Sequence, residues 1–319
     1  MKKTYTAAVH TLGCKLNQAE SESLAADLST QGLTVTAGNA ADIFIINSCS
    51  VTHAADGKSR HLVRTLRSRN PRATIAVTGC YAEWAKEELV KCGADLVCGN
   101  GEKNSLAGLL AAMHPQKRFN PAVKQSGRVR SFIKIQDGCN KFCSYCIVPF
   151  VRPKLYSVDA DSVVKEIRSR TGDGYREIVL TGSEIGSYCS NGLDLTGLIK
   201  LILCETSAAR LHLSSLQPQE ITRDLLALWQ DGRLCKHFHI ALQSGSDGVL
   251  QRMGRRYTTA TFGKAVEMVR AELPDASLTT DIIVGFPGES EEEFRESYEF
   301  CLRMKFAALH IFPYSARPG

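Results

Sequence analysis

The sequence contains no long apolar run, and this absence excludes one class of protein. No segment reaches about 18 uninterrupted apolar residues, the length that a membrane-spanning helix needs. The first ten residues include two lysines but no sustained apolar stretch, so they do not resemble a secretory signal. We therefore expect a cytoplasmic protein without a membrane partner.

The chain also lacks a large excess of charge of one sign, whereas cysteine is abundant. The formal net charge of +6 is compatible with a phosphate-rich partner but does not require one. Hydrophobic residues make up 44% of the 319 residues, which excludes a disordered chain and is enough for two domains with cores. Twelve cysteines in a cytoplasmic chain indicate metal or redox chemistry rather than disulfides.

Three of these cysteines, Cys139, Cys143 and Cys146, lie close together in a C-x3-C-x2-C spacing after an expected strand. Three thiolates on one loop can hold three irons of a 4Fe-4S cluster and leave the fourth iron open for a small molecule. Structural zinc usually takes four protein ligands in paired spacings, and no fourth ligand follows here. The spacing therefore predicts a cluster with one open iron.

The first part of the chain alternates short apolar runs with amphipathic segments, which is typical of a parallel sheet covered by helices. We expect strands at 7–12, 43–47, 74–78 and 95–97, and helices at 18–31, 53–69, 82–91 and 103–113. Three of these strands are followed closely by Cys14, Cys49 and Cys80. Because parallel strands end at one edge of a sheet, these cysteines should converge, each beside a helix N-terminus that favours thiolate. A second cluster site is the simplest interpretation, and burial as small apolar residues is the alternative.

The other cysteines follow no such pattern. Cys98 also ends a strand and is a weaker candidate, and the remainder are interpreted as packing residues: Cys92, Cys189, Cys204, Cys235 and Cys301. Helix 53–69 carries a basic stripe at Arg60, Arg64 and Arg67, which either contacts RNA phosphates or simply faces solvent.

A second series of strands and helices begins after segment 115–128, which is polar, contains two prolines and is interpreted as a linker between domains 1–114 and 129–319. Strands are expected at 129–136, 177–181, 210–214, 238–243, 277–284 and 308–313, and helices at 160–170, 195–204, 221–230, 261–272 and 291–304. The fold class is therefore α/β, an open parallel sheet domain followed by a partial (β/α)6 barrel. In parallel barrels the chemistry gathers at the C-terminal strand ends.

Together these motifs resemble the radical S-adenosylmethionine (SAM) methylthiotransferases. The resemblance runs through essentially the whole chain and rests on the C-x3-C-x2-C loop, on Thr11-Leu-Gly-Cys-Lys-Leu-Asn-Gln, on Asn47-Ser-Cys and on Thr78-Gly-Cys-Tyr. Gly-Cys-Lys-Leu-Asn-Gln and the later Lys-Ser-Arg are similar to the bacterial branch that acts on threonylcarbamoyladenosine in tRNA (MtaB type).

The resemblance implies two 4Fe-4S clusters. Cys139, Cys143 and Cys146 would hold the catalytic cluster that binds SAM, and Cys14, Cys49 and Cys80 would hold an auxiliary one. It also implies SAM contacts from polar strand ends, namely Tyr145, Thr181, Gly182, Ser215, Gln243 and Asp281. Any one of these residues is at least as easily explained as a core polar group or a loop-packing residue.

The implied reaction starts with a 5′-deoxyadenosyl radical from SAM, which removes hydrogen from carbon 2 of threonylcarbamoyladenosine next to the anticodon, at tRNA position 37. The auxiliary cluster would deliver a methylated sulfur. The expected partners are tRNA, through its anticodon loop, and a reductant such as flavodoxin or ferredoxin, and we expect a monomer. No general base emerges from the sequence.

The chain departs from the family pattern near four predicted strand ends. Pro153 begins a segment where glycine and serine flanked by arginines are usual, Glu184 replaces asparagine, Cys189 replaces glycine and Gln217 replaces glutamate. The chain also stops at Gly319 without the C-terminal TRAM domain that grips tRNA, as a fragment or by nature. Two alternatives therefore stay open: the same chemistry on isopentenyladenosine in tRNA or on a ribosomal protein aspartate, and a non-catalytic iron–sulfur RNA-binding protein.

Overall fold

The structure, a computed structural model, describes residues 5–114 and 129–317. These residues form two compact units. The first unit contains 5–114 together with 150–153 and Arg317, and the second contains 129–149 and 154–316. The expected linker, 115–128, lies outside the described residues. Within the described ranges, no helix combines the length and apolar character needed to cross a membrane.

The first unit is built on a parallel sheet in the order β2-β1-β3-β4-β5. Its strands are β1 (Thr6–Thr11), β2 (Thr34–Thr36), β3 (Ile43–Ser48), β4 (Thr74–Gly79) and β5 (Leu96–Val97). Thr11 lies opposite Asn47, which lies opposite Thr78, so the three central strands end level with one another. Four of the five strands are those expected from the sequence. The short β2 is missed because three residues are too few to show a period.

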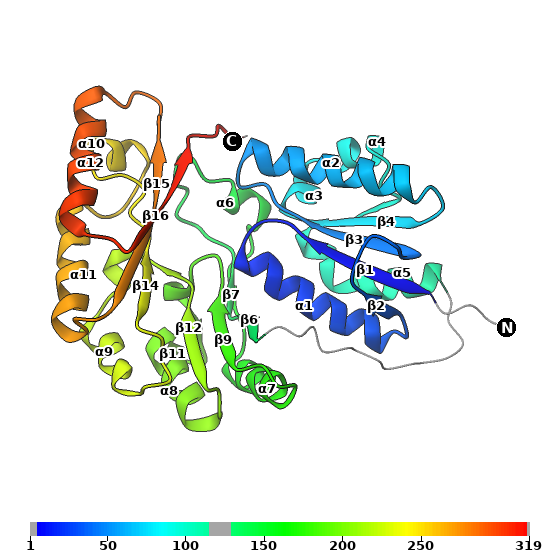
Figure 1. The fold of residues 1–319 in the computed structure, drawn as a ribbon, viewed down its shortest axis with the longest axis horizontal. Coiled ribbons are helices and arrows are strands. Elements are labelled where there is room, and N and C mark those ends of the chain that lie inside the picture. Colours follow the sequence, from blue (N-terminus) through cyan, green and yellow to red (C-terminus); the bar gives the residue numbers. More distant parts are fainter. Residues whose placement is uncertain (1–4, 115–128, 318–319) are drawn as a thin grey trace. The chain divides into compact units, whose positions relative to one another are not determined.

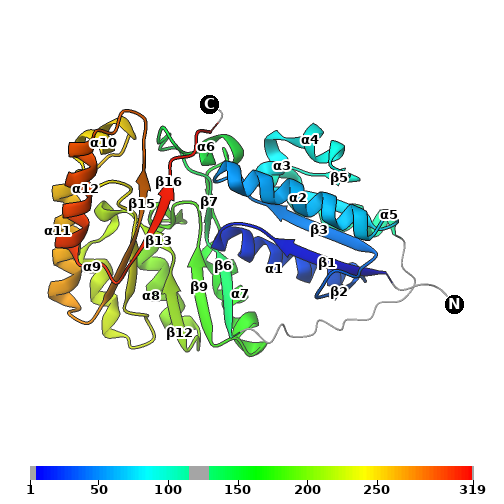
Figure 2. The same ribbon diagram turned by 45° about the horizontal axis from the view of Figure 1, so that its top comes forward.

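Helices cover both faces of this sheet (Figures 1 and 2). On one face, α1 (Lys15–Thr30) and α5 (Leu106–Met113) pack against Ile43 and Ile45, and on the other, α2 (His53–Arg69) packs against Phe44 and Ile46. This division follows from the two-residue period of a strand, which sends successive side chains of β3 to opposite faces. The helix expected at 82–91 is interrupted at Ala85 and forms α3 (Cys80–Trp84) and α4 (Lys86–Lys91).

The second unit contains the expected partial barrel. Its parallel strands follow one another in sequence order: β6 (Arg130–Lys134), β9 (Glu177–Thr181), β12 (Arg210–Leu213), β14 (His237–Ile240), β15 (Ser277–Val284) and β16 (Ala308–Pro313). After β12, the short β13 (Ser215–Leu216) pairs with β14 and joins the two halves of the sheet. Two short antiparallel pairs flank it, β7 (Gln136–Asp137) with β8 (Tyr156–Ser157) and β10 (Cys189–Ser190) with β11 (Leu193–Asp194).

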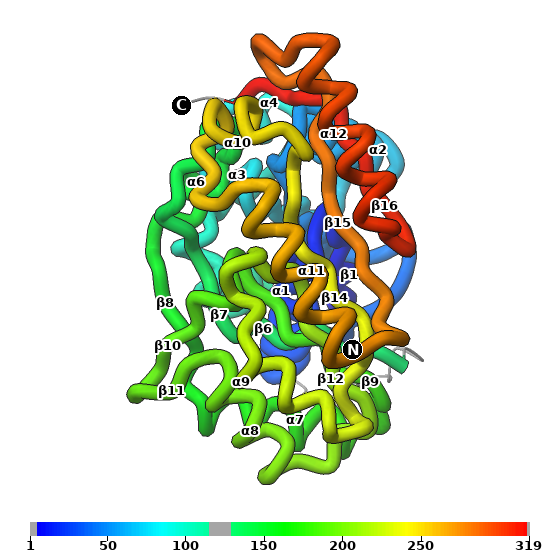
Figure 3. Tube along the Cα trace, turned by 90° about the vertical axis from the view of Figure 1, so that its left-hand side faces the viewer, coloured from blue at the N-terminus to red at the C-terminus, as the bar shows by residue number. Residues whose placement is uncertain are grey.

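One face of this curved sheet is covered by helices. They are α7 (Ala160–Gly172), α8 (Leu195–Glu205), α9 (Arg223–Leu226), α10 (Asp247–Arg252), α11 (Thr259–Glu272) and α12 (Glu291–Met304), while α6 (Val148–Val151) follows the cysteine loop. Figure 3 shows α11 and α12 in front of β14 and β15. Phe238, Ile240 and Leu278 point toward these helices as part of one large core. The alternate residues of the same strands therefore face the inner side of the barrel.

Candidate functional site

The three N-terminal cysteines sit at the ends of three neighbouring strands. Cys14 is the N-cap of α1 after β1, Cys49 follows β3, and Cys80 is the first residue of α3 after β4. Their thiols lie near enough to one another that the charges of Cys14 and Cys80 both act on Cys49. The structure thus brings together the cysteines that the sequence predicted to converge. Their role as cluster ligands stays a prediction.

Two glycines allow this convergence. Gly13 and Gly79 precede Cys14 and Cys80 with φ of +95° and +96°, a region that disfavours residues with a Cβ atom. A Cβ on Gly13 would lie 2.5 Å from Cys49 Sγ, and one on Gly79 would lie 2.4 Å from the carbonyl oxygen of Ser48. The strand ends therefore approach as closely as their backbones permit.

A buried charged network surrounds Cys80. Arg152, only 3% exposed, points its Nε at Cys80 Sγ (3.3 Å) and pairs with both carboxylate oxygens of Glu20 at 2.8 and 2.9 Å. Lys103 also pairs with Glu20, so two cations and one anion are buried beside the cysteine. Such a net positive environment suits an anionic metal group. Sequence analysis missed this network because its members are far apart in the chain.

The cysteines of the second unit lie on a loop between β7 and α6. The loop is anchored by Ser144, whose backbone N–H donates to the carbonyl oxygen of Met253 (3.0 Å) and whose hydroxyl donates to that of Arg252 (2.9 Å). The N–H of Cys146 donates to the carbonyl oxygen of Cys143 (2.9 Å), and Cys139 and Cys143 both act electrostatically on Cys146.

Burial makes these thiols reluctant to ionise. It raises the pKa of Cys49 to about 12 and that of Cys146 to about 11. Desolvation likewise raises the pKa of Cys139 and of Cys14, whose thiol is crowded by protein although the residue reaches the surface. Because iron binds thiolates, loading of either cysteine set must release protons.

Two charged side chains that the sequence did not single out for this role touch the second cysteine loop. Arg255 places Nη1 3.3 Å from both Cys143 Sγ and Tyr145 Oη. Cys139 Sγ lies 3.7 Å from Glu184 Oε2, and Lys141 Nζ lies 3.4 Å from the other carboxylate oxygen of Glu184. Arg255 stands 112 residues from Cys143, so no local pattern could connect them.

The polar residues expected to contact SAM lie after barrel strands that run in the same direction. Thr181 ends β9, where it is buried and its carbonyl oxygen accepts from the N–H of Ile135. Gly182 has no room for a Cβ atom, which would lie 2.7 Å from the carbonyl oxygen of Gln136. Ser215 is exposed, and Gln243 has a positive φ of +70°. For a residue with a side chain that conformation is strained, and such strain concentrates at functional sites.

Tyr145 and Asp281 have partners of their own. The Tyr145 ring packs against a small apolar cluster around Val249, Met253 and Phe286, so loop packing is one of its roles. Asp281 lies within β15, and its two carboxylate oxygens pair with His239 Nε2 at 3.2 Å and His310 Nδ1 at 3.1 Å. Burial alone would raise the pKa of Asp281, but these two imidazoles outweigh it and lower the pKa.

The other sequence interpretations have mixed outcomes. Cys92 and Cys98 are buried in the two cores of the first unit and Cys301 packs against the barrel core, whereas Cys189 and Cys204 are exposed, so packing is the wrong interpretation for those two. Two arginines of the basic stripe of α2 bond within the protein: Arg60 donates to the Tyr81 hydroxyl and Arg67 donates to the Gly93 carbonyl oxygen. The third, Arg64, is exposed.

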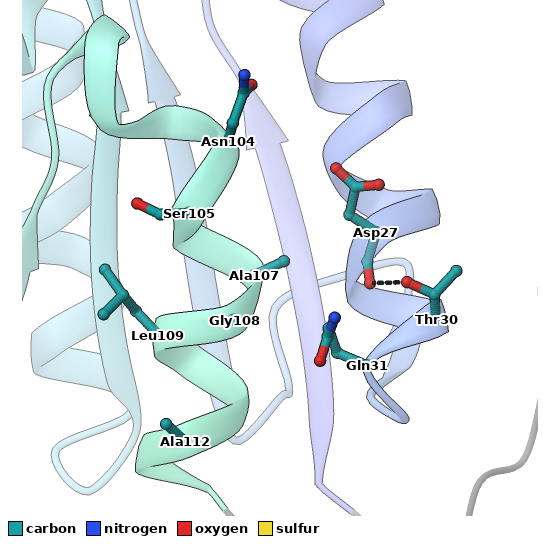
Figure 4. Close-up of a pocket in the computed structure, with 9 residues that line it drawn as sticks. All are labelled: Asp27, Thr30, Gln31, Asn104, Ser105, Ala107, Gly108, Leu109 and Ala112. Carbon is teal, nitrogen blue, oxygen red and sulfur yellow. Dashed lines mark hydrogen bonds between the residues drawn. The ribbon is translucent and has the colours of Figure 1, made fainter.

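A cavity of about 530 Å³ lies between the C-terminal part of α1 and α5 (Figure 4). Its lining has no cysteine, histidine or aromatic residue and comprises Asp27, Thr30, Gln31, Asn104, Ser105, Ala107, Gly108, Leu109 and Ala112. The Thr30 hydroxyl donates a hydrogen bond to the backbone carbonyl oxygen of Asp27 (2.7 Å). With one carboxylate, that of Asp27, and no thiol or imidazole, this lining does not suit an iron–sulfur or zinc site.

Two protein families match the chain. Residues 133–301 match the radical SAM superfamily, and residues 6–99 match the uncharacterized protein family UPF0004. The chain is similar to the solved radical SAM methyltransferase TsrM from Kitasatospora setae, with a TM-score of 0.69 at 14% identity over 98% of this chain and 75% of that one. At this identity, the similarity concerns the fold.

Curated relatives are similar over nearly the full chain. The threonylcarbamoyladenosine tRNA methylthiotransferase MtaB of Thermotoga maritima is 38% identical over 98% of this chain and 76% of its own length, and that of Aquifex aeolicus is 36% identical over 98% and 80%. The tRNA-2-methylthio-N(6)-dimethylallyladenosine synthase of Dictyoglomus thermophilum is 34% identical over 97% and 75%.

Proposed function

The chain belongs to the methylthiotransferase family within the radical SAM superfamily, and on that premise we propose that it converts threonylcarbamoyladenosine at tRNA position 37 to its 2-methylthio derivative. One observation carries this proposal above the others: two separate sets of three cysteines, each gathered at the C-terminal edge of a parallel sheet. The family uses SAM and two 4Fe-4S clusters, and these two sets match that need.

We assign Cys139, Cys143 and Cys146 to the cluster that binds SAM and Cys14, Cys49 and Cys80 to the auxiliary cluster. The residues present fit these groups, because each set offers three sulfur donors and each is accompanied by a buried or half-buried arginine, Arg255 and Arg152. When bound, the two clusters and SAM supply the electron, the 5′-deoxyadenosyl radical and the sulfur.

The protein's own residues bind and orient these groups. Tyr145, Thr181, Gly182, Ser215 and Gln243 are proposed to line the SAM site from successive strand ends. The Arg152 and Arg255 donors near Cys80 and Cys143 stabilise negative charge on the sulfurs, which tunes a cluster's potential. Further proposals are a cytoplasmic location, a flavodoxin or ferredoxin as electron donor, and a monomeric state.

Nucleoside mass spectrometry tests the substrate. The chain is expressed in a host that lacks its own methylthiotransferase for this position, and total tRNA is digested and analysed. We expect 2-methylthio-threonylcarbamoyladenosine with the wild type and none with Cys143→Ala or Cys49→Ala. A 2-methylthio product on isopentenyladenosine alone would reassign the substrate, and no product on any tRNA would contradict the function.

A further inference from the structure

Three donor groups meet on the inner face of the barrel. The donors are a ring nitrogen of His239 on β14, a carboxylate oxygen of Asp281 on β15 and a ring nitrogen of His310 on β16. These ligand atoms all lie within 4.8 Å of one another. Strand pairing places them: Asp281 is directly opposite His310, and His239 is opposite Thr279, the residue two positions before Asp281 on the same face.

The two nitrogen–oxygen distances are compatible with a shared ion. His239 Nε2 and His310 Nδ1 lie 3.2 and 3.1 Å from the two carboxylate oxygens of Asp281. Neighbouring donors that share one metal ion, each about 2.1 Å from it, are themselves separated by about 3.0–3.4 Å. Two imidazoles and one carboxylate are a ligand set used by zinc and by non-haem iron, with positions left open for a further ligand.

A chain of polar contacts, three of them hydrogen bonds, leads from this group through the inner face of the barrel. His239 Nδ1 lies 3.0 Å from Thr279 Oγ1, which lies 3.0 Å from His237 Nε2. His237 Nδ1 lies 2.8 Å from His212 Nε2, and His212 Nδ1 lies 3.5 Å from Glu177 Oε1. Both ring nitrogens of each of these three histidines are therefore engaged.

Neutral side chains satisfy the three hydrogen bonds of this chain. When His239 Nδ1 donates to Thr279, the Thr279 hydroxyl donates to His237 Nε2 and His237 Nδ1 donates to His212 Nε2, all three imidazoles are neutral. The other nitrogen of His239, Nε2, then carries a lone pair and faces an Asp281 carboxylate oxygen 3.2 Å away. A cation at this place would be bound by both groups.

The two carboxylates at the ends of this chain differ in their cationic partners. Glu177 already has Arg130 Nε at 2.7 Å and Arg210 Nε at 3.7 Å. In the part of the chain that the structure describes, the ion-pair partners of Asp281 are the two histidines, with no lysine or arginine. When every donor of the chain points toward Glu177, all three imidazoles are neutral and the Nε2 lone pair of His239 points at Asp281, the state in which histidine binds metal.

We propose that His239, Asp281 and His310 bind a divalent transition-metal ion. The hydrogen bonds that run from His239 through Thr279 and His237 to His212 fix the orientation of the His239 ring. This site is separate from both cysteine sets and does not depend on the proposed function, because its ligands all come from β14, β15 and β16. In this assignment Asp281 is a metal ligand rather than a SAM contact.

Zinc binding to the full chain with reconstituted clusters tests the site. The protein is equilibrated with one equivalent of Zn(II) against a weak chelator, and zinc per chain is measured together with X-ray absorption at the zinc edge. We expect one zinc with nitrogen and oxygen neighbours near about 2.0–2.1 Å and without sulfur near about 2.3 Å. His310→Ala, which changes a mostly exposed side chain, and Asp281→Asn should each weaken zinc binding at least about tenfold.

His61→Ala is the matched control, since His61 is an exposed histidine outside the site, and it should keep the zinc. Thr279→Val should also weaken binding by about tenfold, because His239 then loses the partner that fixes its tautomer. Zinc retained equally by Asp281→Asn, zinc bound through sulfur, or a folded wild type that takes up no zinc would each overturn the proposal.

Discussion

The side-chain amide of Gln217 donates a hydrogen bond of 2.7 Å to Oε1 of the buried carboxylate of Glu184. The resemblance to the family implies asparagine at 184 and glutamate at 217, so both positions are expected to depart from its pattern. The two departures are reciprocal, since the amide and the carboxylate have exchanged places. Glu184 also contacts Cys139, so the exchange conserves an amide–carboxylate bond beside a candidate cluster ligand.

This relationship predicts compensation between two substitutions. Gln217→Glu alone sets two carboxylates against each other at a buried position and should lower the free energy of unfolding by about 3 kcal/mol. Glu184→Asn together with Gln217→Glu restores the bond in the family's arrangement and should recover most of that loss. Urea unfolding of the cluster-free chain measures both, with Gln251→Glu at an exposed position of α10 as the control. A double variant that costs the sum of its single variants would contradict the pairing.

Arg152 should support the first unit even without a cluster. Arg152→Met removes one of the two cations seen to pair with the buried carboxylate of Glu20, the other being Lys103, and should cost about 3–5 kcal/mol of unfolding free energy. Arg64→Met, at an exposed position of α2, should change it by less than about 0.5 kcal/mol. Equal effects of the two substitutions in urea unfolding would show that the buried network is not structural.

Glu220 should make stability fall as pH rises. Burial, reinforced by the charge of Glu184, raises the pKa of Glu220 to about 7 from an ordinary value of 4.5. Between these values the folded state binds the proton more tightly than the unfolded state, so its contribution is complete below pH 4.5 and is lost as pH rises through 7.

The loss should be on the order of 2 kcal/mol between pH 5 and pH 8, and Glu220→Gln should abolish that part of the dependence. Unfolding of the cluster-free wild type and variant at the two pH values measures the difference. A variant that loses as much stability as the wild type over this range would assign the effect to other groups.

Gly79 should be required for two reasons: its backbone φ is positive, and a Cβ atom at this position would clash with its neighbours. Gly79→Ala combines a strained positive φ with a Cβ atom 2.4 Å from the Ser48 carbonyl oxygen. Gly38 is the matched control, because its φ is +117° but nothing lies within 4 Å of an added Cβ. Gly38→Ala should cost about 1–3 kcal/mol, and Gly79→Ala clearly more, with loss of iron from the neighbouring Cys80. Equal stability and iron content of the two variants would refute the steric role.

The sequence was sufficient to place the cysteines because their positions depend on local periodicity and on a general property of parallel sheets. Arg152 and Glu20 could not be paired in this way, since they are 132 residues apart and long-range ion pairs leave no local pattern. The two-residue period of β15 puts Asp281 on the inner face, but only the register between β15 and β16 shows that His310 lies opposite. Topology was therefore predictable, and the polar contacts that depend on register were not.

Iron and acid-labile sulfide per chain test the central claim most directly. They are measured after strictly anaerobic reconstitution of the wild type and of the Cys14→Ala/Cys49→Ala/Cys80→Ala triple variant. Two cubane sites predict about eight irons in the wild type and about four in the variant. About four irons in both proteins would contradict the account, because the N-terminal cysteines would then hold no cluster.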